Sequence, residues 1–192
     1  MFAKPFAVNL LILVPFIVFL CWRKRGLNLS KSTLVFLTLF GIAFGFAEAA
    51  TIIYLRVPTE LLPGYMGDFS ALASKAGEIH AQAELVDKLP PGLYALEFTR
   101  ESLTMLMLIS IAMLSSKLWP ERFSAFLWTF AIWDISYYVI LWLFIRWPSS
   151  LLDYDFLFLV PVPWYAQVWY PLLVSMLTLL AIIALLRSRP CP

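Results

Sequence analysis

The chain has 192 residues, of which 62% are hydrophobic and only 14% are charged, with a formal net charge of +2 and a mean hydropathy of +0.85. Soluble domains have about 45–50% apolar and about 25% charged residues. The composition therefore excludes a water-soluble globular domain, and the small net charge excludes nucleic acid as an expected partner. We predict an all-α fold in a lipid bilayer, a polytopic transmembrane helix bundle that forms a single domain over residues 1–192.

Five segments contain the roughly 20 predominantly apolar residues needed to cross the hydrocarbon core. In chain order, the predicted spans cover residues 5–22, 33–55, 93–116, 123–146 and 165–186. Pro, Gly or clustered cations mark the breaks between them. The first segment is too long for a removed signal peptide and lacks a small-residue cleavage site, so we expect it to stay as a span.

Two connections between the predicted spans have patterns of their own. Residues 69–89 place apolar side chains at spacings of three and four, which predicts an outer amphipathic helix lying on the membrane surface or capping the bundle. Residues 151–164 combine an apolar run with Pro161 and Pro163, which prevent a regular helix. We expect this Pro-rich segment to be interfacial, or to re-enter the membrane where protein covers its backbone.

The distribution of Lys and Arg predicts the orientation of the bundle. With the N-terminus outside, the inner side carries eight of these cations against five on the outer side, and the short connections show the largest bias. We therefore predict an outside N-terminus and a cytoplasmic C-terminus. Both cysteines, Cys21 and Cys191, would then lie on the reducing side, and their spacing predicts neither a disulfide scaffold nor a zinc site. Five aromatic residues are expected to form an interfacial belt on the outer side, namely Trp147, Trp164, Tyr165, Trp169 and Tyr170.

Ionisable residues inside the predicted spans are the main candidates for function. Each charge near the centre of a span costs about 2.5–3.5 kcal/mol on the insertion scale, so such residues mark functional sites by default. At about 1.5 Å per residue, the acids lie in the outer half of the bundle or near its midplane. The candidates, with two tyrosines one turn after the aspartate, are Glu48, Glu97, Arg100, Glu101, Asp134, Tyr137 and Tyr138.

The charges of these candidates do not balance. Four carboxylates face one guanidinium, and Arg100 can bind one carboxylate through two bonds and touch a second. The remaining acids cannot all be ionised in a medium of low dielectric constant, so either some hold protons or a cation lies among them. Gly41 and Gly45, on the face of Glu48, have the small-residue spacing that lets two helices approach closely.

Three interpretations of the buried charges stay open. In the first they are interhelical hydrogen-bonding groups, with Tyr137 or Tyr138 donating to Asp134. In the second they form a proton or cation site, and in the third a catalytic metal site. Within the spans there is no His, which di-iron carboxylate bundles require. His80, Glu84 and Asp87 share a column on the outer helix and are weak metal candidates. No cofactor is expected.

Several motifs resemble a family of small multi-pass bacterial membrane proteins. They are Phe-Ala-Glu-Ala-Ala (46–50), Glu-x-x-Arg-Glu (97–101), Glu-Arg-Phe (121–123), Trp-Asp-Ile-Ser-Tyr-Tyr (133–138), Trp-Pro-Ser-Ser-Leu-Leu-x-x-Asp (147–155) and Phe-Leu-Val-Pro-Val-Pro-Trp (158–164). The resemblance implies a bacterial inner membrane and a site at Glu48, Glu97, Arg100, Glu101 and Asp134, and it supplies no activity.

The function predicted from these observations is non-enzymatic. The carboxylate–arginine cluster would bind or relay a proton or small cation from the outer side. The alternatives are an accessory subunit of a larger membrane complex, and a membrane-embedded metal-dependent enzyme. Partners other than the bilayer would be further copies of this chain or other membrane subunits.

Overall fold

The computed structural model describes residues 3–56, 90–159 and 163–188. The predicted outer helix over 69–89, with His80, Glu84 and Asp87, lies outside the described residues. The described elements are η1 (Phe6–Leu13), α1 (Val14–Trp22), α2 (Lys31–Arg56), α4 (Pro91–Ser115), α5 (Trp119–Ile145), β1 (Tyr154–Phe158), β2 (Trp164–Gln167) and α6 (Trp169–Arg187).

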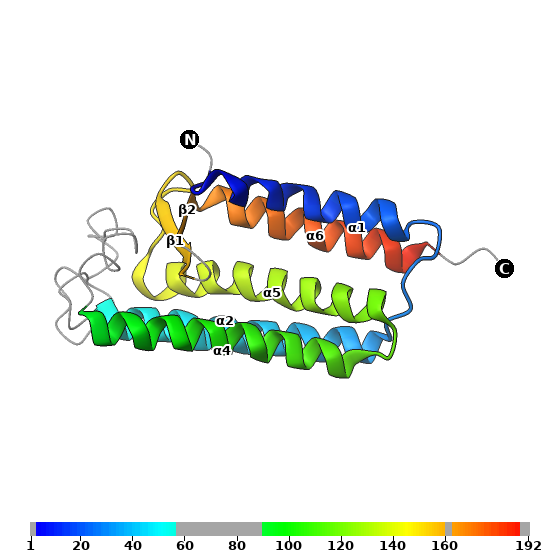
Figure 1. Ribbon diagram of the computed structural model, residues 1–192, viewed down its shortest axis with the longest axis horizontal. Helices are drawn as coiled ribbons and strands as arrows, with labels where there is room; N and C mark the ends of the chain where they lie inside the picture. The colour runs from blue at the N-terminus through cyan, green and yellow to red at the C-terminus, as the bar shows by residue number, and fades with distance from the viewer. Residues whose placement is uncertain (1–2, 57–89, 160–162, 189–192) are drawn as a thin grey trace.

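The prediction of a helical transmembrane bundle is confirmed. Among the described residues, four helices are long and apolar enough to cross a membrane, at 31–54, 91–115, 119–145 and 169–187, and a shorter apolar helix covers Phe6–Trp22. Their long axes run side by side, with α5 in the middle, α1 and α6 on one side of it, and α2 and α4 on the other (Figure 1). Apolar side chains such as Phe36 and Leu114 are exposed on the outer surface, as lipid-facing residues would be.

The first predicted span starts as a 3-10 helix and continues as an α-helix. Asn9 explains part of this, because its side chain bonds the backbone of Ala3 and donates to the carbonyl of Phe6. Tyr170 in α6 donates to the carbonyl of Val8 at 2.8 Å, which ties η1 to α6. Since a 3-10 helix rises about 2.0 Å per residue, η1 and α1 together extend about 30 Å, the thickness of the hydrocarbon core.

The contact between α2 and α5 is close, as the spacing of Gly41 and Gly45 predicts. A methyl group on Gly41 would come within 2.8 Å of Ile132, and one on Gly45 within 2.8 Å of Ser136 and 2.9 Å of the carbonyl of Trp133. The two backbones therefore approach each other at the level where Glu48 begins to face the bundle interior.

Residues 154–167 contain a β-hairpin, which differs from the irregular interfacial segment that the sequence predicts. β1 pairs with β2 in antiparallel register, from Tyr154 opposite Gln167 to Phe158 opposite Trp164, with an irregularity between Phe156 and Phe158. Pro163 directly precedes β2, and the apolar run of β1 pairs with the residues of β2. The last predicted span consequently begins at Trp169 and not at residue 165.

The hairpin closes one end of the bundle, the end at which η1 begins (Figure 1). Two sets of hydrogen bonds anchor it. On one side, the backbone of Lys4 exchanges two hydrogen bonds with that of Tyr165. At the start of the hairpin, Asp153 accepts bonds from the amides of Ser149 and Ser150. These bonds satisfy polar backbone groups that would otherwise be unpaired at membrane depth.

The predicted aromatic belt is partly wrong. Trp147 is 1% exposed and packs with Tyr138, and Tyr170 is 3% exposed and bonds η1. These two rings therefore pack inside the bundle and are not part of an exposed belt, whereas Trp164, Tyr165 and Trp169 are partly exposed. An amphipathic ring near the end of a span can be buried when a hairpin covers it, and the sequence pattern does not distinguish the two cases.

Candidate functional site

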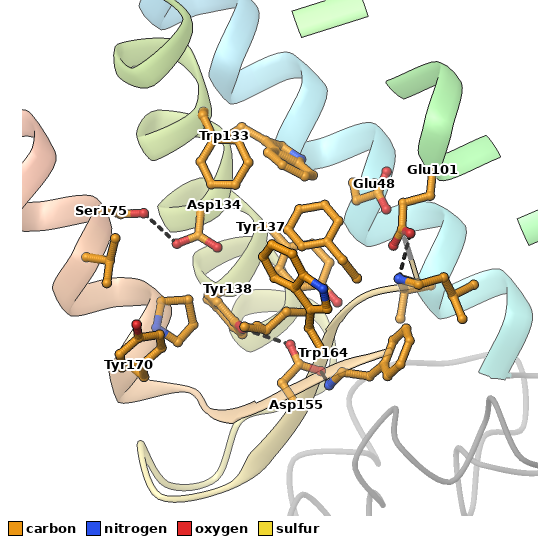
Figure 2. Close-up of a pocket in the computed structure, with 18 of the residues that line it drawn as sticks. Glu48, Glu101, Trp133, Asp134, Tyr137, Tyr138, Asp155, Trp164, Tyr170 and Ser175 are labelled. Carbon is orange, nitrogen blue, oxygen red and sulfur yellow. Dashed lines mark hydrogen bonds between the residues drawn. The ribbon is translucent and has the colours of Figure 1, made fainter. Parts of the chain in front are cut away.

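A polar cavity of about 100 Å³ lies beneath the hairpin, inside the hairpin end of the bundle. Every one of the seven candidates from the sequence lines it, although they come from three different helices (Figure 2). Their convergence is thus confirmed, while their role stays a prediction. The titratable groups around the cavity are Glu48 from α2, Glu97, Arg100 and Glu101 from α4, Asp134, Tyr137 and Tyr138 from α5, Asp155 from β1, and Tyr170 from α6.

We use the name acid cluster for the five carboxylates that line this cavity: Glu48, Glu97, Glu101, Asp134 and Asp155. Among the described lining residues, Arg100 is the single Lys or Arg. Five carboxylates against one guanidinium give a formal charge of −4, one unit more negative than the sequence alone predicts, because Asp155 joins the set. The imbalance is therefore larger than expected.

Arg100 connects α4 to α2 through two carboxylates. Its Nε donates to Glu97 at 2.9 Å and one of its terminal nitrogens bonds the other oxygen of Glu97. Its second terminal nitrogen donates to Glu48 at 2.6 Å. This is the arrangement that the charge count predicts, one carboxylate held by two bonds and a second held by one. The i, i+3 spacing on α4 brings Glu97 to Arg100, and the close α2–α5 packing brings Glu48 into range.

Glu101, the residue after Arg100, contacts the hairpin. Its carboxylate accepts a hydrogen bond at 2.6 Å from the backbone amide of Leu159, the residue after β1, and its side chain is buried. A carboxylate from α4 therefore binds the backbone amide that directly follows β1. The sequence predicts Glu101 as a member of the cluster, but not as the anchor of a β-strand.

Asp134 and Asp155 each have a hydroxyl donor from another element. The hydroxyl of Ser175 in α6 donates to Asp134 at 2.8 Å, and the hydroxyl of Tyr138 donates to Asp155 at 2.8 Å (Figure 2). Of the two tyrosines expected as possible donors to Asp134, Tyr138 therefore donates to Asp155 instead. The reason is that β1 inserts Asp155, which is 1% exposed, into the space beside Tyr138.

Aromatic rings form much of the remaining wall of the cavity. In the view of Figure 2, Tyr137 and Trp164 lie between Asp134 on one side and Glu48 and Glu101 on the other. Trp133 is 6% exposed, and its indole N–H has no hydrogen-bond partner in the described part of the chain. The wall thus presents several π-faces and one unused donor next to the carboxylates.

Among the titratable and hydroxyl-bearing residues of the cavity, sequence reasoning missed Asp155, Ser175 and Tyr170, the last of which it assigned to an interfacial belt. Ser175 is a polar residue near the start of an otherwise apolar span, and such residues hydrogen-bond across helices. Asp155 follows Asp153 in a segment assumed to be interfacial, where an acid attracts no attention. Successive side chains of a β-strand point to opposite faces. An extended segment that contains Asp153, Asp155 and the apolar run would therefore have indicated a strand with an acid pointing inward.

The spacing of the carboxylates bears on metal binding. Within residues 3–56, 90–159 and 163–188, no group of three or more His, Cys, Asp or Glu side chains is placed to hold a metal ion. The acid cluster is divided between Arg100, the hairpin amide and two hydroxyl groups, so its members are held apart. Its chemistry is that of separate carboxyl groups around a small polar space.

These features define a multi-pass integral membrane protein with an acid-rich cavity closed by a β-hairpin. Comparison of the chain with protein-family models, with curated proteins and with solved structures finds no match. Function is therefore argued from the cavity.

Proposed function

We propose that the cavity binds and exchanges protons, so that the acid cluster serves a proton-linked membrane function. The observation that carries this proposal is the formal charge of −4 around a cavity inside the helix bundle. This total already includes the positive charge of Arg100, which contacts Glu48 and Glu97. The other carboxylates receive hydrogen bonds that do not remove their charge. Desolvation and like-charge repulsion both favour carboxyl groups that carry protons.

The positions of the described acids favour bound protons over a bound metal ion as the means of neutralising the acid cluster. A calcium or magnesium ion takes several oxygen ligands at short distance, and the described acids do not form such a group. A cavity of about 100 Å³ has room for a few water molecules, which would connect the separate carboxyl groups. Asp134 and Asp155 are the exchanging groups in this proposal, because each faces a hydroxyl that can both donate and accept.

We further propose that the hairpin end faces outward in a bacterial inner membrane. The excess of Lys and Arg in the connections at the other end supports this orientation. Arg25 lies there, paired with Glu121 at 3.4 Å. The cavity would then take up protons from the outer side.

Infrared spectroscopy of the purified chain in lipid nanodiscs tests the proposal. A protonated carboxyl group shows a C=O stretch that a carboxylate lacks, and we expect this band at pH 7. Asp134→Asn should remove part of the band. Asp153→Asn is the matched control, since Asp153 lies outside the cavity and Asn keeps an acceptor for Ser149 and Ser150.

Two results would overturn the proposal. The first is the absence of a protonated carboxyl band at pH 7 in a folded sample. The second is a large loss of thermal stability when a strong chelator is added, because a bound cation stabilises the folded state by mass action. The second result would favour the metal-dependent alternative.

A further inference from the structure

The polar cavity adjoins an apolar groove on the side of the bundle. The groove, with a volume of about 350 Å³, lies between η1–α1 and α4, and α5 and α6 form its floor. Val14, Met105, Phe126 and Thr178 represent the four helices that line it. The groove and the cavity share a wall, which includes Ser175. The six residues that line both spaces are Leu11, Phe130, Phe158, Trp164, Val174 and Ser175.

The position of the groove decides what surrounds it. Its walls come mainly from α4, α5 and α6, which are long and apolar enough to cross a membrane, and from the shorter apolar helix over Phe6–Trp22. In a bilayer, an opening between these helices would face hydrocarbon. An apolar groove in this position is filled by an alkyl chain. A water molecule occupies about 30 Å³ and a methylene group is of similar size, so about 350 Å³ corresponds to a chain of roughly a dozen carbons.

The chemistry at the inner end of the groove selects the head group. Ser175 donates its hydroxyl proton to Asp134, the carboxylate nearest this junction. The acid cluster outnumbers Arg100, so an anionic head group such as a phosphate is repelled and a cation is attracted. Tyr137 and Trp164 present aromatic faces beside the same carboxylates (Figure 2). Carboxylates and aromatic faces together recognise ammonium groups.

We propose that this protein binds a single-chain amphiphile with an ammonium head group, a long-chain amine, with the chain in the apolar groove and the head group in the polar cavity. The inference rests on the proposed function and deepens it, because it names the ligand of the same cavity. One ammonium that enters supplies one positive charge, and one proton leaves the acid cluster, so the charge of the cavity is unchanged. The groups facing this exchange are the acid cluster, Arg100, Tyr137, Tyr138 and Tyr170.

The experiment uses the full chain in nanodiscs and dodecylammonium with a brominated chain. Bromine quenches the fluorescence of a tryptophan that it contacts, and Trp164 lines both the groove and the cavity. We expect saturable quenching that is lost in Trp164→Phe. Dodecanol, dodecanoate and butylammonium are matched probes that lack the charge, reverse it or lack the chain, and each should bind at least about tenfold more weakly, a difference of 1.4 kcal/mol.

Two pairs of variants separate the groove from the cavity. Val174→Phe should fill the groove and weaken binding at least about tenfold, while Leu173→Phe, on the exposed side of α6, should leave it unchanged. Asp134→Asn should weaken binding of dodecylammonium but not of dodecanol. In weak buffer, a pH-sensitive dye should report release of about one proton for each amine bound, as the exchange requires.

Each result either supports the inference or overturns it. Equal binding of dodecylammonium, dodecanol and dodecanoate would overturn it, as would unsaturable quenching that is unchanged in Val174→Phe. If dodecylammonium does not bind while the infrared band of protonated carboxyl groups is present, the ligand is wrong and the proton site stands. If the amine binds with no band and no proton release, the proposed function fails and the amine site stands.

Discussion

At the scale of single residues, Arg100 has the most demanding environment. It contacts Glu97 on its own helix and Glu48 on α2, and its side chain is 22% exposed. Removing one partner of a partly buried ion pair leaves the other charge without compensation, and this costs more than the pair itself contributes. The cavity already has an excess of negative charge. Loss of Arg100 increases this excess, whereas loss of an acid decreases it.

We expect Arg100→Ala to lower the free energy of unfolding by about 3 kcal/mol. Glu48→Gln and Asp134→Asn should each change it by about 1 kcal/mol or less, because each removes a negative charge while keeping a hydrogen-bonding group. Thermal unfolding in detergent gives the comparison, with the exposed Arg187→Ala as control. A smaller loss for Arg100→Ala than for Glu48→Gln would mean that the observed ion pairs do not stabilise the fold.

Tyr138 offers a second prediction at this scale. Its hydroxyl donates to the buried Asp155 at 2.8 Å. Tyr138→Phe should destabilise the fold by about 1–3 kcal/mol, since a buried carboxyl group loses a donor. Tyr154→Phe is the matched control, because Tyr154 is 41% exposed on the same hairpin. Hydrogen exchange at the β1 amides should increase in Tyr138→Phe, and equal exchange in both variants would contradict this prediction.

The sequence predicts some of these residue contacts and not others, for a physical reason. Glu97 and Arg100 are neighbours through helical spacing alone, and the charge count requires a second acid near Arg100. The bond from Tyr138 to Asp155 depends instead on where the hairpin folds back. Nothing local to residues 138 or 155 encodes that position, so the sequence does not predict this pair.

At the scale of elements, the close approach of α2 to α5 sets the position of the helix that carries Glu48. Gly41 and Gly45 allow this approach, and each would clash with α5 if it carried a methyl group. In a membrane, helices associate through close packing and hydrogen bonds, because lipid is as apolar as the helix surfaces. The two glycines therefore contribute to the geometry of the cavity as well as to stability.

We expect Gly45→Ala to destabilise the bundle by about 1–3 kcal/mol, the range for overpacking a close contact. Gly92→Ala is the matched control, since Gly92 also lies in a helix and a methyl group there would meet nothing within 4 Å. That control should be neutral or slightly stabilising, because Ala favours helix by about 1 kcal/mol relative to Gly. Equal unfolding temperatures for the two variants would show that α2 shifts outward at little cost.

Prediction of the elements succeeds where local apolar length decides and fails where distant contacts decide. The four long helices follow from hydropathy, which needs no knowledge of neighbours. The β-hairpin depends on Glu101 accepting from Leu159 and on Lys4 pairing with Tyr165, contacts that join residues far apart in the chain. The 3-10 helix likewise depends on Tyr170 reaching Val8.

At the scale of the whole molecule, charges of opposite sign gather at opposite ends. The acid cluster lies beneath the hairpin, and η1 begins at the same end (Figure 1). The connection after α1 at the other end carries Arg23, Lys24 and Arg25. A bilayer with a positive-inside bias would hold that end in the cytoplasm. The proposed path for protons and amines from the outer side requires this orientation.

Thiol labelling of intact cells tests the orientation. Cys21 is exposed near the end of α1 that lies away from the hairpin, and Cys191 lies beyond α6, outside the described residues. A membrane-impermeant maleimide should leave both unlabelled until the membrane is permeabilised, because both are predicted to be cytoplasmic. In a variant without these cysteines, Leu152→Cys should react in intact cells, since Leu152 is 63% exposed at the hairpin end. Labelling of Cys21 in intact cells, together with protection of Leu152→Cys, would show that the orientation is the opposite of the predicted one. The hairpin end with its cavity would then lie on the cytoplasmic side.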